Sequence, residues 1–136
     1  MMCCDYDFSC WVIRYDRKSI NGKFYRNDTL TNHDRLIVPL LWNHQHFDTD
    51  SVLGTAVLEN RPEGIFAYCT FNNSPSADTA RTLIDDKGTV SISPYLNRVK
   101  YSGNFIVNGV IREVSLVYER VDPDELYYPV INKEEE

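Results

Sequence analysis

The sequence predicts a mainly β domain of the α+β type, antiparallel and barrel-like, with one helix or a few. Three observations lead to this prediction. Short runs of β-branched and aromatic residues recur along most of the chain, and clusters rich in Asn, Asp, Gly and Pro separate them. One segment carries apolar residues at helical spacing, and it comes directly before a strand. We therefore expect a barrel-like sheet with one inserted helix.

The first predicted strand covers residues 8–15, which are rich in aromatic and β-branched side chains. A polar stretch over 16–22 ends it, and the density of Asn, Asp and Thr over 27–34 predicts a loop. Residues 37–42 predict a short buried strand. Pro39 within that strand indicates a strand start or a sheet edge, because proline has no N–H to give to a ladder.

Residues 53–59 and 65–71 predict a hairpin around 60–64, where proline and glycine supply the turn. Residues 74–85 predict the helix. It begins with a serine suited to the N-cap and a proline in the first turn, its apolar residues share one face, and Gly88 ends it.

The second half of the chain again reads as strands. Residues 89–95 predict the strand that follows the helix, and 97–101 with 104–107 predict a hairpin around a Ser-Gly pair. Residues 110–118 predict a long final strand. The chain then becomes acidic, and we expect a mobile tail over about 130–136.

The composition predicts a single domain over residues 1–136, since this length supports one core. The net charge of −6 and scattered basic residues argue against nucleic-acid binding through a basic field. No apolar stretch approaches the roughly 20 residues of a membrane span, and the first residues do not resemble a secretory signal. The four cysteines include no C-x-x-C pair, so we expect reduced thiols in a cytoplasmic setting and no structural zinc.

His44 is the candidate general base. It follows the apolar run 37–42, so the core would hold its backbone while its side chain remains accessible, and its ordinary pKa lies near neutrality. A surface histidine in a loop is the alternative. His46 and Asp48 would make a metal site with it, but the sequence offers no convincing further ligand.

Ser91 and Ser93 are the candidate nucleophiles, and they share one face of a strand because side chains alternate with period two. Pro94 predicts that the ladder ends, or lies at an edge, just after Ser93, which would leave Ser93 at an accessible strand tip. The alternative is that both serines belong to the polar face of a half-buried strand. Cys69 is a possible thiol nucleophile, although buried cysteines are usually inert packing residues.

Glu113 interrupts an apolar strand, and a carboxylate is costly to bury unless it is paired. It therefore either faces water, forms a surface pair with a cation, or has a buried partner such as an imidazole N–H. A serine, a histidine and an acid are the residue types that acyl transfer requires.

Three sequence motifs occur in the order that is typical of one protein family. They are Val-Pro-Leu-Leu-Trp-Asn-His over 38–44, the serine strand over 92–100, and Ile-Arg-Glu-Val-Ser-Leu-Val over 111–117. With them the chain resembles the tailed-phage prohead proteases, or capsid maturation proteases, whose fold is similar to that of the herpesvirus assembly proteases. The resemblance covers residues 8–124 and implies a serine endopeptidase.

By position, the resemblance implies that His44 is the catalytic histidine, Ser93 the nucleophile and Glu113 the third member. A common form of the motif reads Ser-Ile-Gly and would place the nucleophile at Ser91, but the tyrosine and asparagine that follow favour Ser93. Pro94 departs from the family, because it removes a backbone N–H that an oxyanion site would use. Arg98, Arg112 and a backbone amide remain as oxyanion donors.

The resemblance further implies action inside the assembling prohead, in the host cytoplasm, on scaffold or capsid-precursor extensions and on the protease itself. These proteins are then its partners, a homodimer is compatible with the fold, and no cofactor, nucleic acid or membrane is involved. Two alternatives come from other classes. One is a non-catalytic capsid-assembly or interaction module of the same fold, and the other is a metal-dependent hydrolase using His44 and His46.

Overall fold

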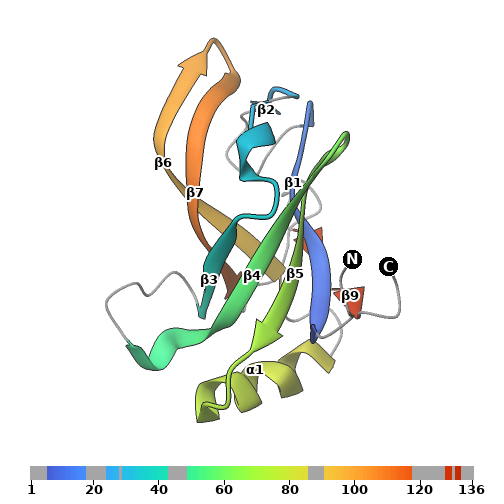
Figure 1. Cartoon of the computed structure of the whole chain (residues 1–136), viewed down its shortest axis with the longest axis vertical. Coiled ribbons are helices and arrows are strands. Elements are labelled where there is room, and N and C mark those ends of the chain that lie inside the picture. The colour runs from blue at the N-terminus through green and yellow to red at the C-terminus, as the bar shows by residue number, and fades with distance from the viewer. Residues whose placement is uncertain are drawn as a thin grey trace.

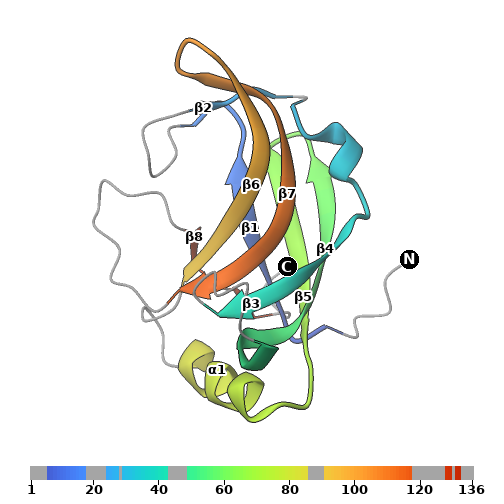
Figure 2. The ribbon, with the colours of Figure 1, turned by 90° about the vertical axis from the view of Figure 1, so that its left-hand side faces the viewer.

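A computed structural model describes residues 6–17, 24–27, 29–42, 49–85, 91–117, 128–129 and 131–132. These residues form a strongly curled sheet and one α-helix, α1 (Pro75–Asp85), which lies across one end of the sheet (Figures 1 and 2). The strands are β1 (Phe8–Arg14), β2 (Phe24–Tyr25), β3 (Ile37–Trp42), β4 (Val52–Arg61), β5 (Gly64–Phe71), β6 (Ser91–Ser102), β7 (Phe105–Val117), β8 (Tyr128–Pro129) and β9 (Ile131–Asn132). The prediction of a mainly β fold with a helix before the serine strand is confirmed. No helix in these ranges is long and apolar enough to cross a membrane.

The strand order along the sheet is β8-β6-β7-β3-β4-β5-β1-β9, and β2 pairs with β7 outside this path. Most neighbours are antiparallel, as predicted, but β3 runs parallel to β7 and so does β2. The sheet is therefore mixed. The reason is the connection through α1, which brings the β6–β7 hairpin back beside β3 rather than extending the meander from β5.

The two edges of the sheet approach each other, which accounts for its barrel-like curl. β8 pairs with Ser91 and Ile92 of β6, whereas β9 pairs with Phe8 and Ser9 of β1 at the other edge. Because β8 and β9 are adjacent in the chain, the edges they join cannot be far apart. The tail predicted from about residue 130 overlaps β9, and residues 133–136 lie outside the described ranges.

The core fills the inside of the curl and extends to α1. In α1, Ala77 and Ala80 are buried, while Leu83 and Ile84 pack against the core from its edge. The predicted N-cap is present, since the Ala77 N–H donates to Ser74 Oγ at 3.1 Å, and proline takes the first helical position. The predicted stop at Gly88 lies outside the described residues.

The predicted hairpin of β4 and β5 is confirmed, with Pro62 and Glu63 alone forming the turn. Gly64, which closes it, lies against β1. A Cβ at Gly64 would be 2.0 Å from the Ile13 carbonyl oxygen, and one at Gly54 would be 1.8 Å from the Thr70 carbonyl oxygen. Glycine is required at both positions by this close approach of backbones.

The four short strands predicted between residues 89 and 118 are wrong as separate elements. They merge into β6 and β7, two long strands that reach beyond the rest of the sheet (Figures 1 and 2). The ladder shifts register between Asn97 and Lys100, where Arg98 adopts φ 54°. β6 therefore continues through a bulge at Arg98, in the region where the sequence pattern had predicted separate strands.

β3 has the predicted bounds but an interior position, between β7 and β4. Pro39 pairs with Thr55 of β4, and the pairing of β3 with β7 begins one residue later, at Leu40. The missing N–H therefore costs no ladder bond to β7. The expectation that Pro39 marks an edge strand is wrong. The alternative, that Pro39 lies near a strand start, agrees with the pairing to β7, which begins at the next residue.

Candidate active site on the outer face of the sheet

The register of β6 and β7 brings two of the predicted site residues together. Ser93 is paired with Ser115, and Tyr95 is paired with Glu113. Ser93 and Glu113 are therefore diagonal neighbours on antiparallel strands, at a typical Cα separation of about 7–8 Å.

These side chains face away from the core. Ile92 in β6 and Val114 and Leu116 in β7 belong to the core cluster, and Ser93 and Ser115 alternate with them along the strands. Because successive side chains of a strand point to opposite faces, the two serines lie on the outer face of the curled sheet. Glu113, which also alternates with Val114, lies on the same face.

Glu113 is buried and hydrogen-bonded. Its exposed fraction is 2%, and its Oε1 accepts a hydrogen bond of 2.8 Å from the hydroxyl of Ser115, which is itself 0% exposed. A buried carboxylate requires donors of this kind. The prediction that Glu113 forms a surface ion pair is therefore wrong. The prediction that Glu113 is buried with a hydrogen-bonding partner is confirmed, and the partner that the structure shows is the hydroxyl of Ser115.

Ser93 is half-buried and is the third residue of β6. The prediction that the ladder ends just after Ser93 is wrong, since Pro94 pairs with Val114 and β6 continues to Ser102. The prediction of an edge fits better. Within the described ranges, β8 covers only Ser91 and Ile92, so β7 is the single strand paired with β6 from Ser93 onward.

His44 lies outside the described residues, as do His46 and Asp48. Trp42 is the last described residue before this gap. It pairs with Leu116 of β7, the residue after Ser115. Ser91 has a described backbone, paired with Val117, but its side chain is outside the described set.

Arg98 and Arg112, the side chains considered as oxyanion donors, are both exposed. Cys69 is fully buried beside Cys10, and burial raises the pKa of its thiol, so it is a packing residue rather than a nucleophile. Among the described residues, no group of three His, Cys, Asp or Glu side chains is placed to hold a metal ion.

His33 is a buried histidine that the sequence placed only within a loop. Its exposed fraction is 2%, its Nε2 accepts the N–H of Ile111 at 3.0 Å, and its Nδ1 lies 3.0 Å from Asn32 Oδ1. Burial lowers its pKa. The ring is therefore neutral, with the proton on Nδ1, and it anchors β7 two residues before Glu113.

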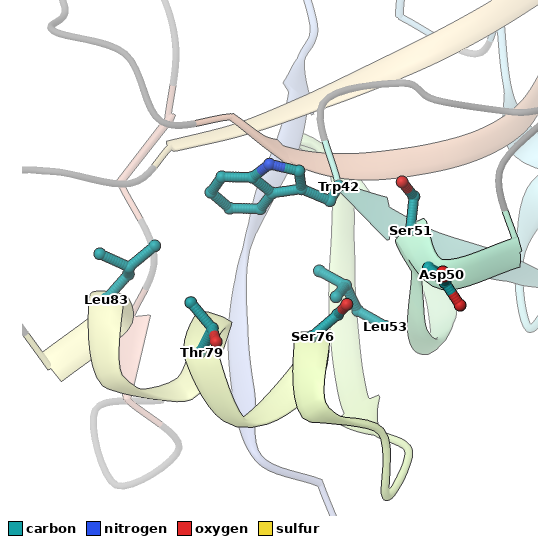
Figure 3. Close-up of a pocket in the computed structure, with 7 residues that line it drawn as sticks. All are labelled: Trp42, Asp50, Ser51, Leu53, Ser76, Thr79 and Leu83. Carbon is teal, nitrogen blue, oxygen red and sulfur yellow. The ribbon is translucent and has the colours of Figure 1, made fainter.

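A separate pocket of about 270 Å³ lies between α1 and the end of β3. Figure 3 shows the indole of Trp42 on one side and Ser76, Thr79 and Leu83 of α1 on the other. Asp50, Ser51 and Leu53 complete the lining. Neither Ser93 nor Glu113 borders it, and its residues come from four elements, namely β3, the 3-10 helix Thr49–Ser51, β4 and α1, so no single sequence motif could have indicated it.

A second polar cluster lies on the outer face of β4 and β5. Arg61 Nε donates to Glu59 Oε1 at 2.7 Å, Arg61 Nη2 donates to the Tyr68 hydroxyl at 2.8 Å, and that hydroxyl donates to Glu59 Oε1 at 2.9 Å. The guanidinium also lies 3.9 Å from the ring centre of Phe66. Burial and the bond to Glu59 raise the pKa of Tyr68, so its hydroxyl remains a neutral donor.

The fold and this geometry define a mainly β protein with a serine–glutamate–serine group on the outer face of its sheet. No protein-family model, curated protein or solved structure matches the chain.

Proposed function

We propose that the chain is a serine endopeptidase in which Ser93 attacks a peptide carbonyl, His44 accepts and returns the proton, and Glu113 orients the imidazole. The observation that carries the proposal is the position of Ser93 and Glu113 on one face of two paired strands. The burial of Glu113 supports its role, because an orienting carboxylate must keep one geometry in a site of low dielectric constant.

Chain length allows His44 to take part. Trp42 pairs with Leu116, which directly follows Ser115 in β7. Two residues of extended chain span about 7 Å at most, which limits the separation of His44 from Trp42. β3 lies directly beside β7, the strand that carries Glu113, at the usual strand spacing of about 4.8 Å.

We further propose the prohead protease type, with a fold similar to the herpesvirus assembly proteases. The order of the three sequence motifs supports this proposal, and so does a curled, mainly β sheet with a helix directly before the serine strand. The substrates are then scaffold or capsid-precursor extensions and the chain itself, within the prohead. Confinement in a shell raises the effective concentration and compensates for modest catalysis.

Co-expression with the capsid precursor tests the proposal, with cleavage followed by mass spectrometry of the products. We expect Ser93→Ala to abolish cleavage and Ser91→Ala to retain it. Loss of cleavage in Ser91→Ala alone would move the nucleophile to Ser91. Normal cleavage by Ser93→Ala would contradict the peptidase and leave the non-catalytic assembly module.

A chelator separates the proposal from the metal-dependent hydrolase. Cleavage should continue in excess EDTA and stop after treatment with a fluorophosphonate, which modifies activated serines. The opposite pattern would favour a metal site that includes His44 and His46.

A further inference from the structure

Ser115 has no role in the mechanism proposed above, although it is fully buried and bonded to Glu113. We infer that Ser115 is a positioning residue of the same site: its hydroxyl fixes the carboxylate of Glu113 in the orientation that the imidazole requires. This inference rests on the proposed function.

The geometry of the bond supports a positioning role. The 2.8 Å distance between Ser115 Oγ and Glu113 Oε1 is normal for a hydroxyl donating to an oxygen acceptor. Both residues are on β7, two positions apart on one face, so the strand itself holds donor and acceptor in register. A donor fixed on one carboxylate oxygen sets the plane of the carboxylate, and with it the direction in which the second oxygen accepts.

The position of Ser115 on the sheet connects Glu113 to the nucleophile. Ser115 is the direct cross-strand partner of Ser93, at a typical Cα separation of about 4.5–5.5 Å. It therefore lies beside both Ser93 and Glu113.

Ser115 is not itself a candidate nucleophile. Its exposed fraction is 0%, whereas Ser93 is half-buried, so a polypeptide carbonyl can approach Ser93 but not the hydroxyl of Ser115. It acts through Glu113, which makes it a positioning residue rather than a catalytic one.

The test compares Ser115→Thr with Ser115→Val, which have nearly the same shape and differ in the hydroxyl. The readout is kcat and KM for hydrolysis of p-nitrophenyl acetate by the full chain. We expect Ser115→Val to lower kcat about 10- to 100-fold with KM unchanged, as for a misplaced catalytic group. Ser115→Thr should keep kcat within about threefold of the unsubstituted chain, because it retains the donor.

Equal kcat values for the threonine and valine variants would overturn the inference, since packing alone would then explain Ser115. If the larger side chains prevent folding, Ser115→Ala replaces them, and a folded alanine variant with full kcat overturns the inference in the same way. The proposed function fails separately, through Ser93→Ala: if that variant hydrolyses the ester at the normal rate, there is no serine chemistry for Ser115 to assist.

Discussion

Two glutamates on the outer face of the sheet have similar partners and very different surroundings. Glu59 accepts from the Tyr68 hydroxyl at 2.9 Å, and Glu113 accepts from the Ser115 hydroxyl at 2.8 Å. The side chain of Glu59, however, is 42% exposed and forms an ion pair with Arg61, whereas Glu113 is 2% exposed.

This difference in exposure separates a structural carboxylate, Glu59, from one whose surroundings suit catalysis, Glu113. An exposed ion pair gains little, because water and salt screen it and two long side chains lose freedom. A buried carboxylate is costly, and its geometry is fixed by a few donors in a low-dielectric environment. Glu113 therefore has the surroundings of a functional group, and Glu59 those of a surface pair.

The largest expected difference between the two sites is in activity. Glu113→Gln should lower kcat for ester hydrolysis about 1,000-fold or more, since in the proposed mechanism it removes the charge that orients and stabilises the imidazole. The matched change Glu59→Gln should leave kcat within about twofold. Steady-state kinetics on the two purified variants measure both, and a similar kcat in the two variants would show that Glu113 has no greater part in the reaction than Glu59.

Stability should differ next. Ser115→Ala removes a donor from a buried carboxylate and should lower the free energy of unfolding by about 1–3 kcal/mol. Tyr68→Phe removes a donor from a half-exposed carboxylate that keeps Arg61, and should cost about 1 kcal/mol or less. Urea denaturation at pH 7 measures both changes. A larger loss of unfolding free energy in Tyr68→Phe than in Ser115→Ala would show that burial does not determine how much each hydrogen bond contributes to stability.

The strand that carries Glu113 should respond to acid through His33. Burial lowers the pKa of His33 from 6.5, so the neutral ring is favoured in the folded chain, and its Nε2 accepts the Ile111 N–H. Its contribution to stability is present above pH 6.5 and is lost as the pH falls from 6.5 through the lower pKa of the folded state.

Amide hydrogen exchange at Ile111 measures this effect. After correction for intrinsic exchange rates, protection at Ile111 should fall as the pH is lowered below 6.5, and more than protection of the amides around Glu59. The control is His33→Gln, which retains an acceptor but does not titrate in this range. The same pH response in the control would assign the effect to other groups.

The smallest effect should come from the Glu59 cluster itself. Arg61→Lys removes the planar donor that bonds Glu59 and stacks on Phe66, and should cost about 0.5–1 kcal/mol in low salt. At 1 M salt the cost should shrink, because screening weakens the pair in both proteins. Thermal unfolding at two salt concentrations tests this, and a salt-independent cost above 2 kcal/mol would contradict the surface-pair description.

Local sequence patterns predicted β3, the β4–β5 hairpin and the capped helix α1, since turn residues, caps and alternation act over a few positions. They did not predict the parallel pairing of β3 with β7, because register between distant strands depends on the whole sheet. The division of β6 failed for a related reason: the bulge at Arg98 continues a strand that its sequence seems to interrupt.

The candidate site was predictable in its residue types but not in its contacts. Glu113 stood out as a charge within an apolar strand, and its need for a partner followed from the cost of burial. Ser115 carried no such signal, because a serine in a strand is common and only the fold shows that it is buried beside the carboxylate. His33 was missed because its burial depends on packing against β7.

Covalent labelling shows whether Ser93 carries an activated hydroxyl, on which the proposed peptidase depends. The full chain is incubated with a fluorophosphonate, and the modified residue is identified by peptide mass spectrometry. We expect one adduct, on Ser93, whose rate of formation falls sharply in His44→Ala and in Glu113→Gln but not in Glu59→Gln. Absence of an adduct on Ser93, or labelling that proceeds equally fast without His44, would contradict the proposed peptidase.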